Sequence, residues 1–141
     1  MEITYTLFNI ANTIILLCWL PLLVAPKASL TQKIVAFPYV PFVLSFFYLF
    51  FLVQSEGLAE ADFSQLDGII LLFKNTTPAA AAAGWMHYLA FDYWVGCWVL
   101  RDAQERKIPH LWIVLPLLCT FMLGPVAVSY THLTLPTTPY V

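Results

Sequence analysis

Charged residues are scarce in this chain. Of its 141 residues, 10% are Asp, Glu, Lys or Arg and 61% are hydrophobic, whereas soluble domains carry about 25% charged residues and fewer than half apolar ones. This composition excludes an ordinary soluble domain. Six Lys and Arg against eight Asp and Glu leave no basic stripe that could neutralise a phosphate backbone, so nucleic acid is not an expected partner.

The patterns that hold metals and cofactors are also missing. The three cysteines form no CxxC pair and lie inside apolar runs at Cys18, Cys97 and Cys119, which predicts small buried residues. Glycine-rich phosphate loops, paired carboxylates and Ser-His-Asp spacings do not occur. From the rise of a helix, His87 and His110 come out roughly 13 Å or more apart in depth, so they cannot share an ion and we expect no metal or other cofactor.

Long apolar segments are present instead. About 20 apolar residues are needed to cross about 30 Å of hydrocarbon, and four segments meet this test: residues 3–24, 34–53, 79–100 and 109–128. We therefore predict an all-α fold, an integral membrane four-helix bundle that forms a single domain over residues 1–128. Thr77 is the expected N-cap of the third helix, with Pro78 as its first residue.

Basic residues predict the orientation of the spans. The loops after the first and third spans contain five of them (Lys27, Lys33, Arg101, Arg106 and Lys107), and the second loop contains Lys74 alone. The positive-inside rule then places loops 25–33 and 101–108 in the cytoplasm or stroma and both termini on the outer side. The acidic loop 54–77 includes an apolar run, 69–73, that is too short to span. This loop is either an interfacial or lid-like segment or a loop resting on the headgroups.

Prolines interrupt two of the spans. Pro38 and Pro41 lie in the second span, and Pro116 and Pro125 lie in the fourth. Each is expected to break the backbone ladder and bend its helix, because proline has no N–H and clashes with the preceding turn. Such bends either open a cavity or accommodate packing.

Polar residues inside the spans are the candidates for function, because they are costly in hydrocarbon without a partner. On the first helix, one stripe contains Asn9 and Asn12, which either bridge helices or contact a ligand. On the third, His87 and Asp92 lie five residues apart, about 140° around the axis, and must face different neighbours. His87 is either a structural histidine or an acid–base group, and Asp92 is the single charged residue deep in a span.

Depth arithmetic places four polar residues in one layer. Asn12, Ser45, His87 and Thr120 come out about 12 to 14 Å below the outer boundary. We therefore predict a small polar chamber centred on His87. Proton chemistry on a lipid-soluble substrate follows, with His87 as base or acid and Tyr88 or Asp92 as proton donor.

One string of residues resembles a known family. Residues 84–96, Gly-Trp-Met-His-Tyr-Leu-Ala-Phe-Asp-Tyr-Trp-Val-Gly, with Arg101-Asp102, Ile108-Pro109-His110 and Phe121-Met-Leu-Gly-Pro125, resemble the neoxanthin-synthase-like, abscisic-acid-deficiency family of four-span membrane proteins. The resemblance implies a multi-pass protein of a plastid membrane or a bacterial inner membrane. For the plant members it also implies conversion of violaxanthin to neoxanthin. Relatives often have Arg at the position of Cys97, so this chain lacks that charge.

Two interpretations follow for function. The first is carotenoid isomerisation, with His87, Asp92 and Tyr88 as catalytic candidates and with substrate contacts from Asn9, Asn12, Ser45, Trp85 and Thr120. The second is a non-enzymatic carotenoid- or lipid-binding protein, or an assembly partner of another membrane enzyme. A channel or exporter is less favoured, because no internal repeat is present.

The expected partners are membrane lipid and carotenoid, together with a second copy of the chain or another membrane enzyme. Residues 129–141 resemble translated sequencing-adaptor read-through. We expect this tail to lie outside the domain and to have no function.

Overall fold

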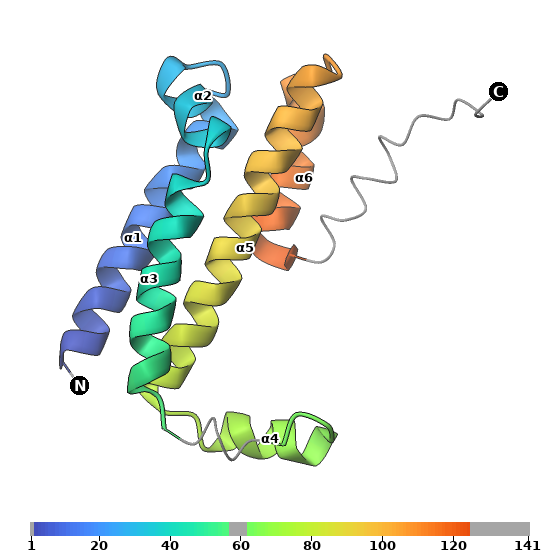
Figure 1. Ribbon diagram of the computed structural model, residues 1–141. Coiled ribbons are helices and arrows are strands. Elements are labelled where there is room, and N and C mark those ends of the chain that lie inside the picture. The colour runs from blue at the N-terminus through green and yellow to red at the C-terminus, as the bar shows by residue number, and fades with distance from the viewer. Residues whose placement is uncertain (1, 57–61, 125–141) are drawn as a thin grey trace. The chain divides into compact units, whose positions relative to one another are not determined.

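The structure is a computed structural model that describes residues 2–56 and 62–124. All regular secondary structure in these residues is helical, which confirms the predicted all-α class. The six helices are α1 (Glu2–Val24), α2 (Ser29–Ala36), α3 (Tyr39–Gln54), α4 (Leu66–Lys74), α5 (Pro78–Glu105) and α6 (His110–Leu123) (Figure 1). The predicted tail and Pro125 lie outside the described residues.

Local sequence rules set the ends of the long helices. Helix α1 covers the first predicted span, and α5 begins at Pro78 as expected. The hydroxyl oxygen of Thr77 accepts a hydrogen bond from the backbone N–H of Ala80 at 3.2 Å, which confirms Thr77 as the N-cap. Helix α5 then continues to Glu105, five residues beyond the predicted span.

The second predicted span is divided into two helices. Helices α2 and α3 are bent by 55° relative to each other, and Phe37 between them is extended, with φ −134° and ψ 140°. Pro38 explains the break, because its ring disfavours a helical conformation at the preceding residue. The predicted ladder break at Pro41 is wrong, because Pro41 lies in the first turn of α3, where its missing N–H has no helical partner to lose. Pro116 lies inside α6 as expected.

Length and hydropathy identify fewer spans than the sequence pattern does. Within residues 2–56 and 62–124, α1 is the one helix that is by itself long and apolar enough to cross a membrane. The bent pair α2 and α3 adds a second if the two form one span, and α6 is apolar but shorter. The four-span arrangement and its orientation therefore stay predictions.

The chain divides into two compact units. Among the described residues, the first unit combines 2–17 with 39–56 and 62–90, and the second combines 18–38 with 91–124. The core of the first unit is built from α1, α3 and α5, by Ala11, Ile15, Leu44, Phe51, Ala82, Ala83, Met86 and Leu89. Small alanines on α5 let the neighbouring side chains approach its backbone closely.

The core of the second unit is centred on an aromatic side chain. Trp19 is 2% exposed and makes edge-on contacts with Tyr93 and Phe121, at ring centroid distances of 5.6 and 5.2 Å. Gly96 lies against the indole ring, since a Cβ there would fall 2.6 Å from Cη2 of Trp19. The absence of a side chain at Gly96 thus provides the space that this ring occupies.

Candidate functional site

The first unit contains a pocket of about 670 Å³, which we call the His87 pocket. Its walls come from α3, the loop after α4, α4 itself and the first turns of α5, through Tyr48, Leu52, Leu72, Phe73, Thr76, Ala80, Ala81, Ala83, Gly84, Trp85, His87 and Tyr88. The lining is mostly apolar, and the volume lies in the range of pockets that hold small organic ligands, about 300–1,000 Å³. Three residues predicted as catalytic or substrate-binding, Trp85, His87 and Tyr88, meet here.

The imidazole of His87 faces a tyrosine that the sequence analysis missed. The ring centroids of His87 and Tyr48 are 5.6 Å apart, and the two ring planes are inclined by 52°. Tyr48 belongs to the aromatic run of α3, and nothing in that run distinguishes it from neighbouring residues that face outward. Its position beside His87 depends on the rotation of α3 about its axis. The pocket thus contains one imidazole and two phenols.

A second aromatic pair is held by a residue of α1. The rings of Trp85 and Tyr88 stack with centroids 6.1 Å apart and planes 24° apart. The indole N–H of Trp85 donates a hydrogen bond to Oδ1 of Asn12 at 3.0 Å. Asn12 therefore bridges α1 and α5, which was the interhelical alternative predicted for it. By fixing Trp85, it also limits where Tyr88 can lie.

None of the three other residues grouped with His87 in the predicted polar chamber lines this pocket. The pocket walls are largely apolar and include neither Asn12 nor Ser45. Ser45 is exposed and donates its hydroxyl hydrogen to the carbonyl of Pro41 at 2.9 Å. Thr120 belongs to the second unit, where it is buried and donates to the carbonyl of Pro116 at 2.8 Å. Both hydroxyls bond within their own helices, a local option that depth arithmetic does not consider.

The other predicted site residues lie outside the pocket. Asn9 is exposed on α1, and Asp92 is buried, with 7% of its surface exposed. His87 is exposed and lines the pocket, whereas Asp92 is buried and does not line it. This difference agrees with the predicted angle of about 140° between the two residues around the helix axis. The catalytic role of Asp92 and the substrate contacts of Asn9, Ser45 and Thr120 stay predictions.

The acidic loop contributes to the pocket through a helix. Helix α4 lies beyond the end of α3 and the start of α5 in Figure 1, and its residues Leu72 and Phe73 line the pocket. Asp62 and Gly68 fix the approach to this helix, because a Cβ on Gly68 would overlap the carbonyl oxygen of Asp62. The apolar run predicted to be interfacial or lid-like is therefore helical and forms one wall of the His87 pocket.

Metal-ligating residues do not gather at this site. Within the part of the chain that the structure describes, no three His, Cys, Asp or Glu side chains lie close enough together to hold a metal ion. The imidazole of His87 and the phenols of Tyr48 and Tyr88 line the pocket, and such groups can give and take protons.

Comparisons with known proteins agree with the predicted family. The chain is 27% identical over 115 residues to "Protein ABA DEFICIENT 4, chloroplastic" of Arabidopsis thaliana, and the alignment covers 76% of this chain and 51% of the relative. The chain thus spans about half the length of this curated relative. No solved structure matches the chain. The ABA DEFICIENT 4-like family matches residues 6–130, and the chain therefore belongs to that family.

Proposed function

We propose that this chain is a four-span membrane protein that isomerises an epoxycarotenoid in the His87 pocket. The observation that carries the proposal is the pocket itself, an apolar cavity of about 670 Å³ with one imidazole and two phenols in its walls. A carotenoid end group is apolar except at its oxygen atoms. It would bury its carbon skeleton against the apolar walls and present its epoxide oxygen to the hydroxyl groups.

Surface composition supports the membrane location. Large apolar side chains are widely exposed, including Val53 at 83%, Leu111 at 82% and Trp112 at 76%. Such surfaces are unfavourable in water and suit contact with lipid tails. The proposed orientation has loops 25–33 and 101–108 in the stroma or cytoplasm, in a plastid membrane or a bacterial inner membrane. A reporter fused at residue 104 should be accessible only from that side, and accessibility only from the outer side would overturn the orientation.

The proposed reaction moves protons and breaks one C–O bond. Tyr88 donates its phenolic proton to the epoxide oxygen as the bond between that oxygen and the polyene-side ring carbon breaks, and the bonding pair stays on the oxygen as a hydroxyl. His87 removes the proton from the neighbouring chain carbon. The electron pair of that C–H bond forms the second double bond of an allene. No atom is gained or lost, and return of the proton from His87 to Tyr88 restores the site.

The experiment is expression of the full chain in a violaxanthin-accumulating host, followed by chromatographic analysis of its pigments. We expect the allenic isomer with the unchanged chain, and at least about a hundredfold less with His87→Ala or with Tyr88→Phe. Tyr5→Phe is the matched control, because Tyr5 is exposed on α1 and does not line the pocket.

Two outcomes would contradict the proposal. Formation of the isomer by both variants would reject the roles of His87 and Tyr88. Co-purification of carotenoid without any isomer would favour the second candidate, a carotenoid-binding protein, which the mostly apolar lining of the pocket also suits.

A further inference from the structure

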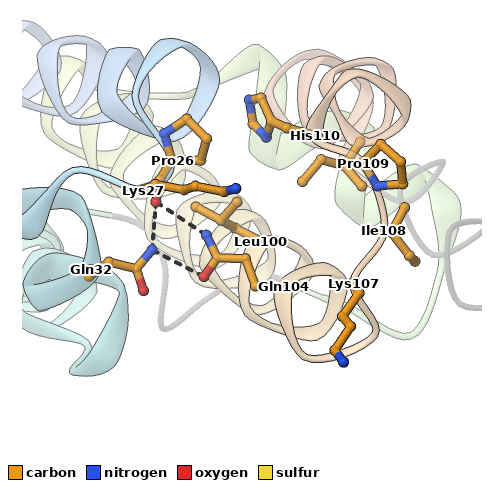
Figure 2. Close-up of a pocket in the computed structure, with 10 residues that line it drawn as sticks. Pro26, Lys27, Gln32, Leu100, Gln104, Lys107, Ile108, Pro109 and His110 are labelled. Carbon is orange, nitrogen blue, oxygen red and sulfur yellow. Dashed lines mark hydrogen bonds between the residues drawn. The ribbon is translucent and has the colours of Figure 1, made fainter.

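The second unit contains a separate pocket of about 520 Å³ with a different chemical character, which we call the basic pocket. Three segments form it: the α1–α2 connection with α2, the end of α5 and the start of α6. The polar residues in its walls are Lys27, Gln32, Gln104, Lys107 and His110 (Figure 2). Leu100 and Ile113, both buried, supply an apolar floor.

Hydrogen bonds between glutamine side chains hold these segments together. Gln32 donates to the carbonyl oxygen of Pro26 and, at 3.0 Å, to Oε1 of Gln104. Gln104 donates to the same Pro26 carbonyl at 3.2 Å. Figure 2 shows the resulting triangle of bonds at one side of the pocket. These bonds fix the α1–α2 connection and α2 against the end of α5, and such preorganisation reduces the entropy lost on binding.

The charge around the pocket is positive. Two lysines, Lys27 and Lys107, line it, and no acidic residue does. The nearby carboxylate of Asp102 forms a salt bridge with Arg106 at 2.9 Å. Figure 2 shows Lys27 extending towards the α5–α6 side of the pocket and Lys107 extending from the rim away from the glutamines. An anion in the pocket would thus meet the ammonium group of Lys27, with Lys107 at the rim and no carboxylate in the walls.

His110 joins the start of α6 to the end of α1 at the edge of the pocket. Its Nε2 lies 2.7 Å from the carbonyl oxygen of Leu23 in the last turn of α1. Because a carbonyl oxygen only accepts, Nε2 carries a hydrogen. In the part of the chain that the structure describes, Nδ1 is buried and has no hydrogen-bond partner.

The backbone at Lys107 is unusual for a lysine. Lys107 has a φ of 57°, and its N–H donates to the carbonyl of Gln104 at 3.1 Å while the N–H of Ile108 donates to the carbonyl of Ala103 at 2.8 Å. These bonds form a Schellman motif at the end of α5, and its left-handed position is usually glycine. A lysine at this left-handed position is less stable than a glycine would be, which indicates that the charge of Lys107 has a function.

We propose that the basic pocket binds an anionic phosphate group, and that the source of this phosphate is the headgroup of a membrane lipid. The loops that form the pocket are the positively charged ones, and basic pockets between helices on the cytoplasmic or stromal side suit anionic headgroups. The lipid source rests on the proposed membrane orientation, whereas the phosphate site goes beyond the carotenoid chemistry and does not depend on it.

The test measures lipid binding to the full chain in neutral detergent by native mass spectrometry. Dioleoylphosphatidylglycerol is compared with dioleoylphosphatidylcholine, and glycerol 3-phosphate is added as a soluble competitor. We expect a preference for phosphatidylglycerol that Lys27→Gln and Lys107→Gly each weaken by about fivefold. Lys33→Gln is the matched control, since Lys33 is an exposed lysine of α2 that does not line the pocket, and it should leave the preference unchanged.

The Lys107→Gly variant separates lost binding from lost folding. Glycine suits the left-handed backbone, so this variant should be at least as resistant to unfolding as the unchanged chain while binding the anionic lipid less tightly.

Three results would overturn parts of the proposal. Equal weakening by Lys33→Gln and Lys27→Gln would show binding to general surface charge and reject the pocket. Equal binding of both lipids, with no effect of glycerol 3-phosphate, would mean that the lysines only neutralise the carboxyl ends of α1 and α5. Saturable binding of glycerol 3-phosphate without a phosphatidylglycerol preference would support the phosphate site and reject the lipid source.

Discussion

The two glycines of α5 allow a matched test of packing in the second unit. At Gly96, an added Cβ would lie 2.6 Å from Cη2 and 2.9 Å from Cζ3 of Trp19. At Gly84, nothing lies within 4 Å of the same added atom. Both positions are inside one helix, so glycine to alanine improves helix propensity equally at each, by about 0.5–1 kcal/mol. The difference between the two variants therefore isolates the contact with Trp19.

We expect Gly96→Ala to be less stable than Gly84→Ala by about 1–3 kcal/mol, the range for adding a methyl group to a filled core. Trp19 cannot move away easily, because it is 2% exposed and lies against the rings of Tyr93 and Phe121. The measurement is the free energy of unfolding in detergent, from a denaturant titration followed by far-ultraviolet circular dichroism.

A second substitution tests the physical cause. The atoms of Trp19 that Gly96 faces belong to the six-membered part of the indole, which phenylalanine does not reproduce in that position. Trp19→Phe should therefore reduce the cost of Gly96→Ala, and a double-mutant cycle measures this coupling. Equal stability of Gly96→Ala and Gly84→Ala would refute the packing of Trp19 against Gly96.

Three further predictions concern local bonds. Thr77→Ala removes the N-cap of α5 and should lower the free energy of unfolding by about 1 kcal/mol. Thr77→Ser keeps a hydroxyl group that can cap the helix, so it should lower the free energy of unfolding much less. A double-mutant cycle of Asn12→Ala and Trp85→Phe should give a coupling of about 0.6 kcal/mol or more for their hydrogen bond, and zero coupling would mean that the bond does not form. Hydrogen bonds from the hydroxyl and the backbone N–H of Ser64, at 2.6 and 2.8 Å, lower the pKa of Asp62. The stability that this carboxylate contributes is therefore present above its unfolded pKa and is lost as pH falls through the lowered value. An NMR titration should show the pKa rising towards its ordinary value in Ser64→Ala, and an unchanged pKa would contradict the turn.

Agreement between sequence and structure is best where the rule is local. The bounds of α1 and the start of α5 at Pro78 followed from apolar length and from the Thr77–Pro78 pair. The prediction for Pro41 is wrong because a proline breaks backbone hydrogen bonds only beyond the first turn of a helix. Pro38 makes α3 begin at Tyr39, and Pro41 therefore lies in the first turn. Such boundaries shift by a few residues when neighbouring signals compete.

Agreement is poorest where a contact joins distant segments. Depth alone grouped Ser45 and Thr120 with His87, although both hydroxyls bond to carbonyls of their own helices. Tyr48 was not predicted, yet its ring lies beside that of His87. Helical rise determines how deep a residue lies, whereas its partners depend on how each helix is rotated about its axis.

The sequence by itself determined the all-α class, the family, the bounds of α1, the start of α5 and the separation of basic from acidic loops. Each of these depends on composition or on residues close together in the chain. Only the tertiary structure decided that Asn12 holds Trp85, that Gly96 makes room for Trp19 and that a Cβ at Gly84 would meet open space. Those outcomes depend on side chains brought together from different helices, and packing of the whole unit sets that proximity.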